Sequence, residues 1–174
     1  LTVKNDTPLS GVVIGVFATC DPRVDEESRT RATNIVKMAA DIVAERVKLP
    51  DGTPVKTVYS DMLVDEEKQA DLVASRFKAE GVNVLICVPD TWAFPQLSLM
   101  SLLSHFPSDT PLNLTCGNSG PKPGVVFTHA ASGAISQSGR LVTINVGTWP
   151  DRGIDPVMTD ATADDLVDWA YAAV

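Results

Sequence analysis

Side chains that could do chemistry gather in three short segments of this chain, and two histidines lie outside them. Residues 19–25 supply an arginine beside two carboxylates, and residues 89–95 supply an aspartate and a tryptophan. Residues 116–124 are rich in glycine and proline, and the histidines are His105 and His129. Such residue types bind phosphate, accept a phosphoryl group, activate a nucleophile or donate hydrogen bonds to a polar ligand.

The first segment disfavours nucleotide and flavin binding. A phosphate-binding loop offers small residues and free backbone amides. Residues 19–25 instead read Thr-Cys-Asp-Pro-Arg-Val-Asp, with two carboxylates and a proline. No G-x-G-x-x-G follows the first apolar run, and no G-x-x-x-x-G-K-[ST] occurs in the sequence. We therefore expect neither FMN nor NAD to bind.

Two further functions, phosphoryl acceptance by a receiver domain and catalysis by a triad, lack part of the sequence pattern that they require. Asp90 follows an apolar run, as the phosphoacceptor of a receiver domain does, but residues 147–151 lack the lysine that a receiver has after its fifth strand. Serine, histidine and aspartate are plentiful, yet no G-x-S-x-G nucleophile elbow supports a catalytic triad. Structural roles are therefore favoured for both histidines.

The segments that must position these loops alternate between apolar runs and helical patterns. Residues 11–18 form a near-continuous apolar run, which is typical of a strand covered on both faces. In residues 25–48 the apolar side chains recur at helical spacing after an acidic first turn. The same reasoning predicts strands at 54–60, 82–88, 111–115 and 140–146, the one at 111–115 being the shortest, and helices at 65–80, 96–105, 125–138 and 161–173.

Five successive β-α units predict an α/β fold with a three-layer, doubly wound sheet of five parallel strands. The common arrangement of five strands is the flavodoxin-like, broadly Rossmann-like order 2-1-3-4-5, in which ligands bind at the carboxyl ends of the strands. All three polar segments follow a predicted strand, so we expect them at that edge. A length of 174 residues with 44% hydrophobic content fits a single domain over residues 1–174.

Composition argues against several classes of partner and site. The net charge is -8, from 22 acidic and 14 basic residues, which leaves no basic stripe for a nucleic acid. No apolar run approaches the roughly 18 residues of a membrane span, so we expect a cytoplasmic protein. The cysteines are odd in number, widely spaced and without a C-x-x-C pair, which predicts buried free thiols at Cys20, Cys87 and Cys116.

Three stretches of sequence together resemble the N-terminal domain of the L-fucose isomerase family. They are IGVFATCDPRVDEESR, VPDTW and GNSGPKPG, at residues 14–29, 88–92 and 117–124. The resemblance spans residues 14–151 and rests on the co-occurrence of these loops at the same β-α positions. It implies the first domain of a longer three-domain subunit. The absent initiator methionine and the stop directly after a helical pattern also predict a piece of a longer polypeptide.

Members of that family are metal-dependent isomerases that interconvert L-fucose and L-fuculose, and often D-arabinose and D-ribulose, through an ene-diol with manganese. Their subunits assemble as hexamers, the metal ligands lie in the second and third domains, and the first domain reaches over the active site of a neighbouring subunit. The resemblance therefore implies a substrate-capping and oligomerisation domain without catalytic residues or metal ligands, inactive by itself.

Carried over residue by residue, the resemblance assigns sugar binding to four residues of these loops. Arg23 matches the arginine that follows the loop aspartate, here Asp21, and Trp92 matches the tryptophan after the third strand. Asn118 lies in the turn of the third segment, where a turn-forming role is favoured over a ligand contact. A guanidinium donates to hydroxyls, and an indole face packs against the apolar face of a sugar. The alternatives are a salt bridge from Arg23 to a neighbouring carboxylate and packing of Trp92 in the core or an interface. Pro22 departs from the family, whose first loop often has more glycine and arginine.

Two other functions remain open on the sequence alone. A stand-alone flavodoxin-like small-ligand or signalling module would have the same fold. The first domain of an L-arabinose isomerase would share the architecture as well.

Overall fold

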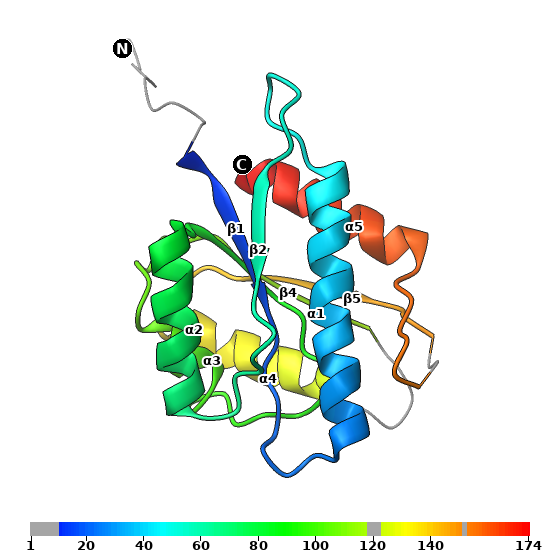
Figure 1. The fold of residues 1–174 in the computed structure, drawn as a ribbon. Helices are drawn as coiled ribbons and strands as arrows, with labels where there is room; N and C mark the ends of the chain where they lie inside the picture. The colour runs from blue at the N-terminus through cyan, green and yellow to red at the C-terminus, as the bar shows by residue number, and fades with distance from the viewer. Residues whose placement is uncertain (1–10, 118–122, 151–152) are drawn as a thin grey trace.

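The computed structural model describes residues 11–117, 123–150 and 153–174, which form a five-stranded parallel sheet covered by five helices (Figure 1). The elements in chain order are β1 (Val13–Phe17), α1 (Glu26–Arg46), β2 (Lys56–Tyr59), α2 (Glu67–Glu80), β3 (Val84–Cys87), α3 (Leu99–Leu103), β4 (Leu112–Gly117), α4 (Gly124–Gln137), β5 (Thr143–Gly147) and α5 (Asp160–Ala173).

The strand order is β2-β1-β3-β4-β5, and every neighbouring pair is parallel. Ile14 of β1 lies opposite Thr57 of β2 on one side and Val84 of β3 on the other. The predicted flavodoxin-like order is therefore confirmed. Because all strands run the same way, their carboxyl ends share one edge, and the chain changes winding direction there between β1 and β3.

Helices cover both faces of the sheet, so the predicted three layers are confirmed (Figure 1). Helices α1 and α5 pack on one face, and α2, α3 and α4 pack on the other. Alternate side chains of β1 enter the two cores: Ile14 and Val16 contact the first layer, and Val13 and Phe17 the second. This two-sided burial explains why the strand reads as a continuous apolar run.

Helix α1 begins at Glu26 because Asp25 caps it. The Asp25 carboxylate accepts a hydrogen bond from the backbone N–H of Ser28 at 2.7 Å, and acidic residues occupy the first turn, where the helix dipole favours negative charge. The buried stripe of α1 is apolar apart from Ser28 and Arg31. A buried arginine on such a stripe requires an acceptor inside the protein.

The prediction that the strand at 111–115 is the shortest is wrong. Strand β4 runs over Leu112–Gly117, and its six residues make it the longest described strand. Gly117 reads as the start of a loop, yet it pairs with Gly147 of β5. A Cβ at Gly117 would overlap the indole ring of Trp149, so glycine here allows close packing. The predicted helix at 96–105 is likewise shorter, Leu99–Leu103.

The three cysteines are buried and free, as predicted. Burial raises the pKa of the Cys20 and Cys116 thiols, and raises that of Cys87 to about 12. The thiols therefore stay protonated near neutral pH and pack as small apolar side chains. Across the described ranges, no helix combines the length and the apolar character needed to cross a membrane.

Gly117→Ala should lower the free energy of unfolding by about 1–3 kcal/mol, because the added methyl group must displace the buried ring of Trp149. The matched control is Gly133→Ala inside α4, where an added Cβ meets nothing within 4 Å. Alanine is the better helix former, so this variant should be more stable by about 0.5–1 kcal/mol. Urea unfolding measures both changes, and two changes of the same sign would contradict the packing described here.

Candidate functional site

Loops that follow β1, β3 and β5 meet at the carboxyl edge of the sheet. The first two are in direct contact, since the Thr91 hydroxyl donates a hydrogen bond to the Cys20 sulfur at 3.7 Å. The loop after β4 begins at this edge too, but Asn118 lies outside the described residues. The predicted convergence at this edge is thus seen for the first two polar segments.

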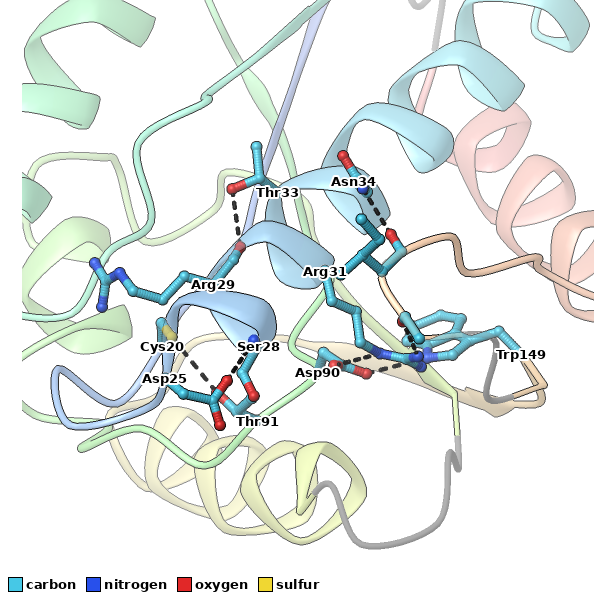
Figure 2. Close-up of polar contacts among 12 residues, drawn as sticks. Cys20, Asp25, Ser28, Arg29, Arg31, Thr33, Asn34, Asp90, Thr91 and Trp149 are labelled. Carbon is cyan, nitrogen blue, oxygen red and sulfur yellow. Dashed lines mark hydrogen bonds and ion pairs between the residues drawn. The ribbon is translucent and has the colours of Figure 1, made fainter.

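A buried polar network anchors these loops (Figure 2). Arg31 reaches from α1 and donates through Nε to Asp90 at 2.9 Å, and Trp149 donates through Nε1 to the other carboxylate oxygen at 3.3 Å. Arg31 also donates through Nη1 to the backbone carbonyl of Gly153 at 2.7 Å. The Arg31 and Asp90 side chains are 2% and 0% exposed. One ion pair therefore connects α1 with the loops after β3 and β5.

The network gains a second link from α1, because the Asn34 amide donates to the carbonyl of Ile154 at 2.6 Å (Figure 2). Removing one member of a buried ion pair strands the other charge in a medium of low dielectric constant and costs about 3–5 kcal/mol. The ion pair at Asp90 therefore restrains the backbone of the next two residues, Thr91 and Trp92.

Asp21 and Arg23 form a closed pair in the loop after β1. Arg23 donates to the two carboxylate oxygens of Asp21 through Nε at 2.9 Å and Nη2 at 2.7 Å, and its backbone N–H donates to Oδ1 at 2.9 Å. The hydrogen bonds and charge of Arg23 lower the pKa of the Asp21 carboxyl, and Asp21 raises the pKa of Arg23. The salt bridge proposed as the alternative role of Arg23 is thus present. It leaves the Arg23 side chain 74% exposed, against 10% for Asp21.

Aromatic rings of the loop after β3 complete this edge. The guanidinium of Arg23 lies over the ring of Phe94, 5.4 Å from its centroid. Trp92 makes an edge-to-face contact with Phe127 of α4, with the ring centroids 6.1 Å apart, and remains partly exposed. Trp92 therefore packs on its own chain with part of its surface and offers the rest to solvent. Within the described part of the chain, Nη1 of Arg23 makes no hydrogen bond.

The buried ion pair brings in two side chains that the sequence did not single out, Arg31 and Trp149. The available signal for Arg31 was a charge among the apolar positions of a predicted helix, at helical spacing from Ile35. Asp90 was considered only as a phosphoacceptor, but it is 1% exposed and ion-paired. A buried, paired carboxylate is a poor phosphoryl acceptor, so Asp90 is structural here.

Neither histidine joins this edge. His105 lies in the turn after α3 and contacts Asp71 of α2 at 2.8 Å, while His129 is exposed on α4. Among the residues with described positions, no three histidine, cysteine, aspartate or glutamate side chains are placed to hold a metal ion. The edge can therefore donate hydrogen bonds and offer aromatic surface to a neutral polar ligand, but the described residues supply no metal centre.

Comparison with known proteins identifies the family of this chain. Residues 11–174 match the family described as L-fucose isomerase, first N-terminal domain. The L-fucose isomerase of Phocaeicola vulgatus is 27% identical over 129 residues, which cover 72% of this chain and 21% of that protein. That of Bacteroides thetaiotaomicron is 26% identical over the same length, with the same coverage. That of Streptococcus pneumoniae is 25% identical over 164 residues, covering 92% of this chain and 27% of that protein.

The chain therefore spans about a quarter of the length of these curated relatives. The match favours an L-fucose isomerase over the first domain of an L-arabinose isomerase. It also favours one domain of a larger subunit over a stand-alone module. Because the family match covers all the described residues and the fold is the predicted one, this chain belongs to the family of L-fucose isomerase first N-terminal domains.

Proposed function

We propose that this chain is the substrate-capping and oligomerisation domain of a metal-dependent aldose–ketose isomerase that converts L-fucose to L-fuculose and D-arabinose to D-ribulose. The observation that carries the proposal is an exposed guanidinium held in place at the carboxyl edge of a domain of this family. Arg23 is fixed by Asp21 and Phe94, and the partly exposed Trp92 belongs to the same loop as Phe94.

The two side chains have complementary roles toward a sugar. Arg23 donates hydrogen bonds to Asp21 through Nε and Nη2, and its Nη1 donors are available to sugar hydroxyls. The partly exposed ring of Trp92 offers an apolar face to the C–H face of the sugar. Asp21 acts as a positioning residue, since it fixes the guanidinium. Asn118 is the third proposed sugar contact and completes the set of four proposed site residues.

The chemistry itself is assigned to other domains. Aldose–ketose isomerisation moves a proton between adjacent carbons, and a metal ion such as manganese polarises the neighbouring oxygens. The residues with described positions do not form a ligand set for that ion, so we place manganese and the catalytic groups in the remaining domains of the subunit.

We further propose that the subunits assemble as a hexamer in which this edge covers the active site of a neighbouring subunit. Sugar-binding groups without a catalytic centre beside them function only when another part of the assembly supplies that centre. The exposure of Arg23 supports this arrangement.

The 174-residue chain alone should show no ketose formation from L-fucose in the presence of manganese, because we assign the metal ligands to other domains. A colorimetric ketose assay measures this, with the longer enzyme as the positive control. Turnover by the isolated chain above the buffer background would refute the assignment.

Trp92→Ala in the longer enzyme should raise the KM for L-fucose about tenfold to a hundredfold, which corresponds to about 1–3 kcal/mol of lost aromatic contact. Manganese affinity should not change, since the metal lies in other domains. Trp92→Phe is the matched control and should retain most of the affinity. An unchanged KM together with a lower melting temperature or a dissociated oligomer would show that Trp92 serves only packing.

Asp21→Asn in the longer enzyme should raise KM by roughly three- to tenfold with little change in kcat, because Arg23 loses the charged partner that orients it. In an Arg23→Ala background the same substitution should have little further effect. The pKa of Asp21 is lowered, so the pair should persist as pH falls toward the ordinary aspartate range, and the parent KM should stay flat between pH 8 and 5. Additive effects of the two substitutions would argue against a positioning role.

A further inference from the structure

An apolar groove of about 690 Å³ lies at the opposite end of the sheet from the candidate site. Its walls come from the start of β4, from the residues before β5 and from the last turns of α5: Pro111, Leu112, Leu141, Val142, Trp169 and Ala173. Ser108, Asp109 and Thr143 add polar groups to the lining. An apolar centre accompanied by polar groups is the usual anatomy of a protein interface.

Leu141 makes this groove unusual, because the residue is 89% exposed, the highest value among the exposed large hydrophobic residues described. An isolated exposed leucine is ordinary on a protein surface, but Leu141 borders a concave apolar surface rather than standing alone. The groove therefore offers both a projecting apolar group and a hollow beside it.

A second hollow of about 300 Å³ lies on the other flank of the same helix end, lined by Lys48, Leu49, Pro50, Tyr171 and Val174. Between the two hollows the last turn of α5 is fixed to α1, since the Tyr171 hydroxyl donates to the carbonyl of Arg46 at 2.9 Å and accepts from the N–H of Lys48 at 3.3 Å. A rigid ridge with a hollow on each side can receive a partner without rearranging.

We propose that this surface, the groove at Leu141 and Trp169 with the end of α5, is the docking site for the part of the same subunit that follows residue 174. The relatives are about four times longer than the matched region, and the family is described as a first N-terminal domain. A polypeptide that continues from α5 emerges between the two hollows, so the following domain reaches this surface without a long linker. The occupant is an apolar segment of that domain, placed over Leu141.

The proposed docking surface is separate from the edge proposed to bind the sugar. Because this surface lies at the amino ends of β4 and β5, a domain docked there leaves Arg23 and Trp92 at the carboxyl edge open to a sugar. The inference rests on the proposed longer polypeptide but not on its substrate. Failure of the sugar-binding predictions would therefore leave it standing.

The test substitutes Leu141→Glu in the longer enzyme and in the 174-residue chain, with Leu72→Glu as the matched control. Leu72 is 50% exposed on α2, which packs on the other face of the sheet from α5. In the longer enzyme Leu141→Glu should lower the melting temperature by roughly 2–6 °C and speed proteolytic cleavage just after residue 174. In the isolated chain, where Leu141 is solvated, the shift should stay below about 1 °C, and Leu72→Glu should change neither protein by more than that.

Three results would overturn the proposal. Leu141→Glu could leave the longer enzyme unchanged, which would mean that nothing apolar covers the groove. It could destabilise the longer enzyme and the isolated chain equally, which would give Leu141 a role within this domain. The isolated chain could dimerise in analytical ultracentrifugation and lose the dimer in Leu141→Glu, which would make a second copy the occupant.

Discussion

The ion pair between Arg31 and Asp90 holds helix α1 and the loops after β3 and β5 together at the carboxyl edge of the sheet. Both side chains are almost fully buried, so each is tolerated only because the other, with Trp149 and the carbonyl of Gly153, satisfies it. The four residues come from α1, the loop after β3 and the loop after β5. A pair of this kind does not need to add stability to be important, because it limits the loops to conformations that keep these hydrogen bonds.

The exposed side chains of the carboxyl edge depend on this buried ion pair for their position. Trp92 follows Asp90 by two residues, and Phe94, which supports the guanidinium of Arg23, follows by two more. Groups that contact a ligand bind it best when their backbone is ordered in advance, because little conformational entropy is then lost on binding. The fold thus joins a firmly anchored loop to side chains that face solvent.

Sequence patterns predicted the parts of this structure that depend on neighbours along the chain. The apolar runs, helical spacings and β-α alternation led to the five strands and their order, and the position of the polar segments directly after predicted strands placed them at the edge. They did not predict that Arg31 would meet Asp90 or that Gly117 would lie under Trp149, because those contacts join residues far apart in the sequence. For Arg23 the sequence left two roles open, and the structure shows how the salt bridge to Asp21 coexists with an exposed guanidinium.

We propose that the carboxyl edge of the domain contacts the sugar and that the opposite end contacts the rest of the subunit. A crystal structure of the longer enzyme with L-fucose bound tests the proposed sugar contact most directly. It should place the Trp92 ring of one subunit within about 4.5 Å of sugar carbon atoms, and Arg23 Nη1 within about 3.2 Å of a sugar hydroxyl. A sugar enclosed by other domains alone, with Arg23 and Trp92 covered by protein, would contradict it.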